Sequence, residues 1–182
     1  KATEEFNRNH QHKKRGLSVM PVCFGISFTK TPMNQARSLV HIYQDGSVGI
    51  STGAIEMGQG VNTKIIQVAA HVLSINPDRI KIESTNTTRV ANTSPTAAST
   101  GADLNGHATR LACKALKQRL ENTAAEMLQS KPETIQIENE TIYQGQTKTD
   151  LQWEQLVETA FLKRVCLTEN GHYATPKIHF DK

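Results

Sequence analysis

The sequence predicts an α+β fold, in which a mixed β-sheet is covered by packed helices. Strand-like segments with alternating apolar residues occur in both halves of the chain, and segments between them have the apolar spacing of helices. These strands and helices follow one another without a strict βαβ rhythm, which argues against a purely parallel sheet. A length of 182 residues suffices for one core. We expect a basic tail over residues 1–16 and one domain over residues 17–182.

The first segments should form a buried strand and a hairpin. Residues 17–29, LSVMPVCFGISFT, are apolar and rich in β-formers, and they predict a buried extended segment. In residues 38–52, apolar and polar side chains alternate on either side of the pair Asp45-Gly46, which is a typical turn. This pattern predicts a β-hairpin.

The middle of the chain should hold two helices and a strand. Residues 61–75 have apolar side chains on one helical face and end before Asn76-Pro77. RIKIES, residues 79–84, alternates as a strand does. Residues 85–106 are rich in Ser, Thr and Asn and are long for a connection within a domain, which is typical of functional loops. A long helix should begin near Ala102 and fade near Lys131-Pro132.

The last third should supply short strands and one more helix. Residues 134–144 predict two strands around an Asn-Glu turn, and residues 163–173 predict a final strand and turn. Residues 151–162 predict a helix whose inward face comprises Leu156, Val157, Ala160 and Phe161.

The charge pattern argues against a nucleic-acid partner. Residues 1–16 hold five basic and two acidic residues, and so account for three of the four net positive charges. The remainder is close to balanced, and only Phe6 could stack on a base near the basic run. We expect the basic run to be a solvated helix end or a linker.

The cysteines and histidines predict no metal site. Cys23, Cys113 and Cys166 are far apart, and neither a CxxC pair nor an HxxxH pair occurs. No apolar run is long enough for a membrane span and no signal-peptide pattern is present, so we expect a cytoplasmic protein with no membrane partner. The chain starts with Lys1, and we expect it to be a fragment of a longer protein.

The glycine-rich stretch GAIEMGQG, residues 53–60, joins a predicted strand to a predicted helix. Glycine allows close approach of a ligand to the backbone, and helix amino ends attract anions. The stretch ends in Gly58-Gln59-Gly60, so it fits neither a P-loop nor a dinucleotide fingerprint. The neutral amide of Gln59 suits a heterocycle or an oxo group, and Glu56 is expected to be a structural hydrogen-bond acceptor. A tight turn without a ligand is the alternative.

A second loop, SPTAASTGAD in residues 94–103, also opens a helix. Its small residues allow backbone N–H groups to approach a ligand closely, and the hydroxyl groups of Thr96, Ser99 and Thr100 can donate hydrogen bonds to it. An N-cap would explain one hydroxyl but not three. We expect both loops to converge on one site for a polyanion that is held mainly by backbone. No nucleophile, base and orienting residue come together, so no catalytic residue is predicted.

Three motifs resemble the molybdenum hydroxylases: FGISFTKTPMNQA, DGSVGISTGAIEMGQGVNTKIIQVAA and NTTRVANTSPTAASTGADLNGHA. Among these enzymes they are most similar to the molybdopterin-binding large subunit of bacterial xanthine dehydrogenases. The resemblance covers most of residues 16–176 in the family's order and spacing. It implies a molybdenum-cofactor-binding-domain-like fold, with molybdopterin in the parent enzyme, and identifies residues 17–182 as a fragment of that domain.

The resemblance also implies roles for individual residues. Phe28 and Thr29 match the pair that contacts the purine substrate, although core packing is the simpler reading of Phe28. The positions matching the family's two cofactor loops are Met57, Gly58, Gln59, Thr96, Ala97, Ala98, Ser99, Thr100, Gly101 and Ala102. Ala98 falls where the family packs a small residue beside the molybdenum centre. Arg37 stands where relatives commonly have glycine, and it should be exposed near a strand start.

The implied parent hydroxylates xanthine and hypoxanthine to uric acid with oxygen from water. Its catalytic glutamate lies in a Gly-Glu-Pro-Pro stretch, which this sequence lacks. The implied partners are the purine, the remainder of the large subunit, and an iron–sulfur and FAD-containing subunit or region. The isolated chain is therefore expected to be inactive and free of cofactor. A relative acting on aldehydes or other heterocycles, or a non-catalytic module that binds a phosphorylated ligand or a partner, are the alternatives.

Overall fold

The structure is a computed structural model that describes residues 1–21 and 26–176. Its α+β architecture contains a four-stranded mixed sheet, a three-stranded antiparallel sheet and packed helices, as the sequence predicts. The elements are α1 (Ala2–Asn9), η1 (Thr31–Met33), β1 (Gln35–Ile42), β2 (Val48–Thr52), α2 (Val61–Leu73), η2 (Pro77–Arg79), β3 (Ile80–Ile82), α3 (Gly101–Met127), η3 (Pro132–Thr134), β4 (Ile135–Glu138), β5 (Thr141–Gln144), β6 (Thr147–Gln152), α4 (Trp153–Leu162) and β7 (Thr168–Ala174).

The larger sheet has the strand order β3-β2-β1-β7. β1 and β2 form the predicted hairpin, with Val40 opposite Ile50, while β3 pairs with β2 in parallel and β7 pairs with β1 antiparallel. Along β1 every second residue is buried, which is the alternation expected of a strand with one covered face. Arg37, which was expected to be exposed, is half-buried on this strand.

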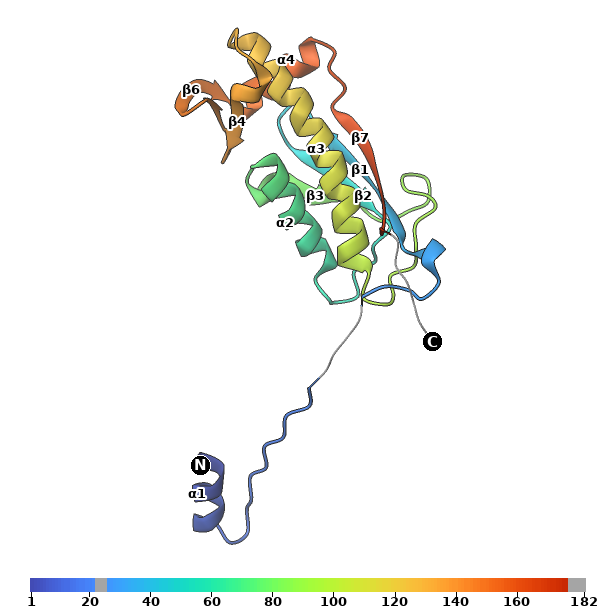
Figure 1. Cartoon of the computed structure of the whole chain (residues 1–182), viewed down its shortest axis with the longest axis vertical. Coiled ribbons are helices and arrows are strands. Elements are labelled where there is room, and N and C mark those ends of the chain that lie inside the picture. The colour runs from blue at the N-terminus through green and yellow to red at the C-terminus, as the bar shows by residue number, and fades with distance from the viewer. Residues whose placement is uncertain (22–25, 177–182) are drawn as a thin grey trace.

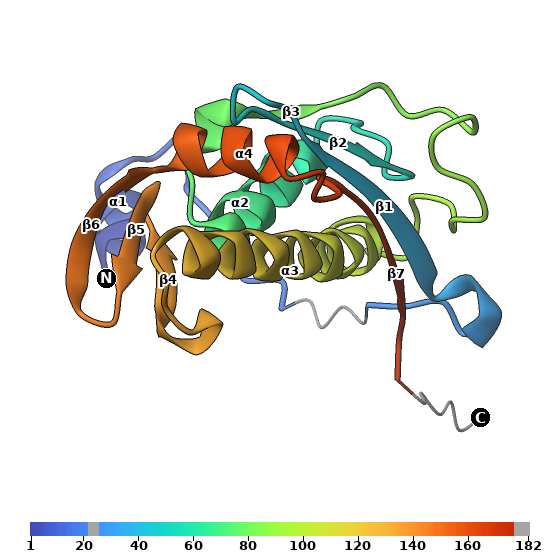
Figure 2. The ribbon, with the colours of Figure 1, turned by 90° about the horizontal axis from the view of Figure 1, so that it is seen from above.

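Helices α2 and α3 lie side by side against one face of this sheet (Figures 1 and 2). Their apolar faces meet the sheet in one core, to which Val40, Ile50, Ile65 and Leu116 contribute. Gly171 on β7 permits the close contact with α3, because a Cβ there would lie 2.0 Å from the carbonyl oxygen of Ala108. Burial of these faces supplies the main driving force for the fold.

A smaller sheet of order β4-β5-β6 extends the fold beyond the carboxyl end of α3, with α4 beside it (Figure 1). The two strands predicted over residues 134–144 are present, and β6 is a further strand that was not predicted. In α4, Leu156, Val157 and Ala160 are buried as expected. Phe161 was expected to face inward and is 47% exposed instead, whereas Trp153 is fully buried and anchors the helix.

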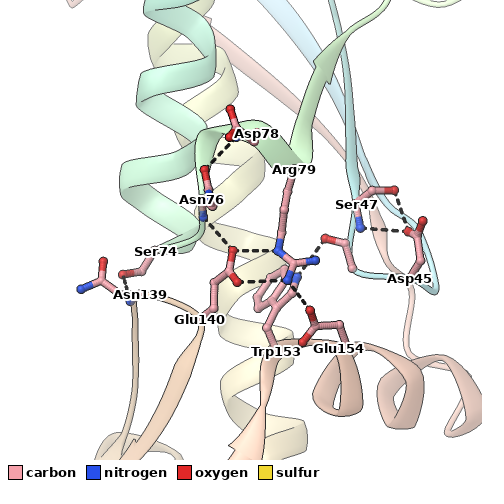
Figure 3. A network of polar contacts seen from close by, with 11 residues as sticks. Asp45, Ser47, Ser74, Asn76, Asp78, Arg79, Asn139, Glu140, Trp153 and Glu154 are labelled. Carbon is pink, nitrogen blue, oxygen red and sulfur yellow. Dashed lines mark hydrogen bonds and ion pairs between the residues drawn. The ribbon is translucent and has the colours of Figure 1, made fainter.

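Arg79, directly before β3 of the larger sheet, pairs with carboxylates of the smaller sheet and of α4 (Figure 3). Its guanidinium donates to both carboxylate oxygens of Glu140, at 2.7 and 3.0 Å, and it also pairs with Glu154. The indole N–H of Trp153 donates to the carbonyl of Gly46 in the hairpin turn at 2.9 Å. These contacts link segments that are far apart in the sequence.

The amino-terminal segment differs from the prediction. Leu17, Val19 and Met20 are between 84% and 86% exposed, and residues 17–21 and 26–29 form no strand. A buried strand needs a neighbouring strand and a covering face, and the described residues of this segment pair with no strand. Residues 22–25 of the predicted segment lie outside the described residues. Helix α1 buries none of its residues and stands apart from the sheets (Figure 1).

Candidate functional site

The two predicted ligand-binding loops meet at one end of the fold. Helices α2 and α3 start at the same end of the molecule, each directly after one of the loops (Figure 1). The backbone N–H of Ile55 in the first loop donates to the hydroxyl of Thr96 in the second at 2.9 Å. Between them lies a pocket of about 320 Å³. The predicted convergence of the loops is therefore confirmed.

Most of the predicted cofactor residues line this pocket. They are Met57, Gln59, Thr96, Ala97, Ser99, Gly101 and Ala102, and Val61 and Lys64 complete the lining. Gly58, Ala98 and Thr100 belong to the same loops without lining the pocket. Thr100 is 1% exposed, and its hydroxyl donates to the carbonyl of Ala97 at 2.8 Å, so it shapes the loop from within.

Glu56 closes the first loop onto the amino end of α2. Its carboxylate accepts from the backbone N–H groups of Gly58 and Gly60, both at 2.9 Å, and from that of Asn62 at 3.1 Å. The hydrogen bonds from Asn62 and Gly60 hold the pKa of the Glu56 carboxyl below its ordinary value. Glu56 is thus a structural acceptor, as predicted. The α2 end already carries a negative charge, and its amides are less available to an anionic ligand than the sequence suggested.

Gln59 lines the pocket while its amide is held by its own loop. Its Oε1 accepts from the N–H of Met57 at 2.5 Å, and its Nε2 donates to the carbonyl of Ile55 at 2.8 Å. One N–H of the side-chain amide has no partner among the described residues and can still donate to a ligand. These bonds fix a neutral donor at the edge of the pocket.

The second loop leaves the amino end of α3 open. Ala98 and Ser99 both adopt left-handed conformations, with φ of 51° and 56°, immediately before the helix. No side chain caps α3, and in the described part of the chain the first-turn N–H groups of Gly101, Ala102 and Asp103 have no protein acceptor. Such an end of a 27-residue helix attracts anions.

Lys64 is a site residue that the sequence reasoning missed. It lies within α2, outside the glycine-rich stretch, so the motifs of that stretch did not include it. In the structure it is the one charged residue in the lining of the pocket, and no carboxylate pairs with it among the described residues. The helical period could have identified it, because Lys64 lies about one turn after Val61, the first residue of α2, and so faces the same side of the helix. Its ammonium group gives the pocket a positive charge.

The predicted substrate residues lie beside the second loop. Phe28 is half-buried and Thr29 is exposed. The backbone N–H of Ser27 donates to the carbonyl of Ala98 at 3.2 Å, which joins this segment to the loop. Neither Phe28 nor Thr29 lines the pocket between the helices, so a substrate at these residues would approach the loop from another side than a ligand in that pocket.

Comparison with known proteins identifies the family of the chain. The family model of the molybdopterin cofactor-binding domain matches residues 1–182. The chain belongs to this family. The match confirms the resemblance drawn from the three sequence motifs.

Curated relatives cover nearly the whole chain. The chain is 40% identical to a xanthine dehydrogenase of Dictyostelium discoideum, 42% to one of Emericella nidulans and 41% to a xanthine dehydrogenase/oxidase of Gallus gallus. The matches cover 98%, 99% and 100% of this chain but 12% of each relative. The molybdopterin-binding domain described here thus corresponds to about an eighth of these proteins.

Solved structures share the fold. Quinoline 2-oxidoreductase of Pseudomonas putida 86 matches with a TM-score of 0.70 at 22% identity, over 77% of this chain and 19% of that one. A copper- and molybdenum-containing CO dehydrogenase matches with a TM-score of 0.71 at 23% identity, over 79% of this chain and 19% of that one. At these identities the likeness supports the fold.

Within the described ranges, no helix has the length and apolar character of a membrane span.

The donors around the pocket fit the cofactor that the family is named for. Molybdopterin is a pterin that carries an anionic phosphate, and the pocket combines the Lys64 ammonium, the Ser99 hydroxyl and the open amides of α3 with a neutral amide from Gln59. A Cβ at Gly101 would lie 3.3 Å from Thr96 and 3.7 Å from Val61, both of which line the pocket. Glycine at this position therefore keeps space beside the helix end.

Proposed function

We propose that this chain is part of the molybdopterin-binding domain of a xanthine dehydrogenase, which hydroxylates xanthine and hypoxanthine to uric acid. The observation that carries the proposal is the pocket at which residues 53–60 and 94–101 converge, in a chain about 40% identical to xanthine dehydrogenases over nearly its whole length. When bound, the cofactor supplies the chemistry, the transfer of an oxygen atom derived from water to a substrate carbon.

In this proposal, separate residues of the chain contact the anionic part of the cofactor, its neutral part and the purine. The open end of α3, Ser99 and Lys64 hold the anionic part of molybdopterin, while Met57 and Gln59 contact its neutral part. The electrostatics of the pocket support this division, because Glu56 occupies the amino end of α2 and the amides of α3 remain open. Phe28 and Thr29 orient the purine, the first by its ring and the second by its hydroxyl group.

The rest of the activity belongs to other parts of the parent enzyme. The catalytic glutamate, the other half of the cofactor site, and the iron–sulfur and FAD-containing regions are proposed to lie outside this chain. The apolar side chains of Leu17, Val19 and Met20 are exposed and close together in the sequence. Their exposure supports contact with the remainder of the large subunit, since exposed apolar patches commonly mark interaction surfaces.

The test uses the full-length protein that contains this chain. Its molybdenum content is measured, and its turnover of xanthine is compared with that of quinoline and of an aromatic aldehyde. We expect stoichiometric molybdenum and a kcat/KM for xanthine at least about tenfold above that for the other substrates. A preference for the aldehyde or for quinoline would assign the chain to a different molybdenum hydroxylase. Absence of both molybdenum and turnover would contradict the proposal.

A further inference from the structure

Asn34 makes a reciprocal pair of hydrogen bonds to one residue of the proposed substrate segment. The backbone N–H of Phe28 donates to Oδ1 of Asn34 at 2.8 Å, and Nδ2 of Asn34 donates to the carbonyl of Phe28 at 2.8 Å. Asn34 is 1% exposed. Only one orientation of its amide satisfies both bonds, because the reverse would set donor against donor and acceptor against acceptor. The side-chain amide of Asn34 thus bonds to the Phe28 backbone with the same pair of hydrogen bonds that a neighbouring β-strand residue would make.

The larger sheet holds Asn34 in place. Its carbonyl accepts from the N–H of Thr175 at 3.0 Å, and its own N–H donates to Thr31 at 2.9 Å in the turn η1. The next residue, Gln35, begins β1 and pairs with Ala174 of β7. The backbone at Phe28 is therefore tied to the end of the sheet through a single buried side chain.

The same loop is tied to the second cofactor loop. Besides the bond from Ser27 to Ala98, the hydroxyl of Ser94 donates to the carbonyl of Met33. The N–H of Ser94 reaches the carbonyl of Gln35 at 3.4 Å. These bonds fix residues 27–35 relative to residues 94–98, so that Asn34 determines where Phe28 and Thr29 stand beside that loop.

We infer that Asn34 is a positioning residue for the substrate, which sets the places of the Phe28 ring and the Thr29 hydroxyl. It acts through the backbone of Phe28 and therefore on substrate binding rather than on the cofactor. This inference rests on the proposed function, in which Phe28 and Thr29 contact the purine.

The decisive variant is Asn34→Asp in the full-length enzyme. Aspartate has the same shape and keeps an acceptor for the Phe28 N–H, but it sets a charged oxygen against the Phe28 carbonyl. Protonation restores the missing donor, and burial favours the protonated form of a carboxyl group. We expect the KM for xanthine to rise about tenfold at neutral pH and to return toward the wild-type value as the pH falls. Molybdenum content should stay unchanged and kcat should stay within about twofold.

Two further variants make the test specific. Asn34→Ser removes both bonds without adding charge, so it should raise KM to a similar extent with no added pH dependence, and it serves if the aspartate variant fails to fold. Asn122→Asp makes the same chemical change at an exposed position on α3 and should leave all constants unchanged.

The inference is overturned if KM stays within about twofold of wild type for folded Asn34 variants. It is also overturned if molybdenum content and thermal stability fall while KM does not move, because the residue would then serve the scaffold alone. A wild-type enzyme that turns over another substrate but not xanthine would refute the proposed function instead. The same KM comparison with that other substrate then decides the role of Asn34 on its own.

Discussion

At the scale of single residues, three side chains decide how the site can be used. Glu56 neutralises one helix end and Lys64 adds a positive charge to the pocket, while Gln59 presents a neutral amide that its own loop holds in place. Sequence alone identified Glu56 as a structural acceptor, because nothing ionisable nearby could tune it. The same reasoning passed over Lys64, since its position in the pocket depends on how α2 is turned toward α3.

Thr29→Ala in the intact enzyme should weaken purine turnover more than cofactor loading. The exposed Thr29 hydroxyl is proposed to touch the substrate, and loss of a neutral hydrogen bond costs on the order of 1 kcal/mol. Steady-state kinetics with xanthine and a molybdenum determination on the same sample separate the two effects. Unchanged kinetics at equal molybdenum content would refute this role for the hydroxyl group.

Lys64→Ala should reduce retention of the cofactor in the intact enzyme. Removal of an exposed cation next to an anionic group should cost about 1 kcal/mol, which is several-fold in affinity. Molybdenum and released pterin are measured after dialysis at increasing salt concentration. Lys114→Ala, which removes the same charge from an exposed position on α3 outside the pocket, is the control. Equal losses in the two variants would show that Lys64 acts only through the net charge.

At the scale of elements, the contacts between segments explain both the successes and the errors of the sequence predictions. The hairpin and helices α2 and α3 are confirmed because their apolar periodicity is long and regular. Residues 17–21 have the same apolar character but no partner strand, and so they stay extended and exposed. Phe161 satisfies the helical period yet lies beyond the edge of the surface that α4 buries.

Glu140 is expected to make the stability of the fold depend on pH. The hydrogen bond from Arg79 holds the pKa of the Glu140 carboxyl below its ordinary value. A lowered pKa in the folded state contributes stability that is fully present above the unfolded-state pKa. This contribution is lost as the pH falls through the folded-state pKa. Glu140→Gln should therefore lower the free energy of unfolding at neutral pH by about 1 kcal/mol.

The measurement is urea unfolding of wild type and Glu140→Gln at a series of pH values. The difference between the two proteins should be constant near neutrality and shrink below the ordinary pKa of a glutamate, about 4.3. Glu158→Gln, at an exposed position on α4, serves as the matched control. A difference that grows on acidification would contradict the assignment of the ion pair.

At the scale of the whole molecule, the chain has a core of its own, and its pocket is proposed to be one half of the cofactor site. One core joins both sheets with α2, α3 and α4, whereas α1 buries none of its residues and residues 17–21 are exposed. The curated relatives named above are about eight times longer, which leaves ample room for the proposed second half of the cofactor site. The isolated chain is thus expected to be stable without being functional.

The isolated chain should fold and yet have no xanthine-oxidising activity and no tightly held molybdopterin. Folding is expected because the sheets and helices bury their apolar faces on one another. A polyanion held by one open helix end and one lysine remains hydrated and screened. The lack of a general base is expected to reduce turnover by about 10²–10⁴-fold. Circular dichroism, molybdenum content and uric acid formation with an artificial electron acceptor test this. Stoichiometric molybdenum with turnover would contradict it.

The sequence by itself determined the α+β class, the hairpin, the two long helices and the two loops that open them. Those features depend on local rules, namely the period of apolar residues and the conformational freedom of glycine. Only the tertiary structure decided which helix end stays open, that Lys64 faces the pocket and that Asn34 holds Phe28. These outcomes depend on contacts between segments distant in sequence, such as the bonds from Asn34 to Phe28 and from Ser27 to Ala98. A local sequence pattern does not specify the relative orientation of two elements, because that orientation is set by the packing of their side chains in the common core.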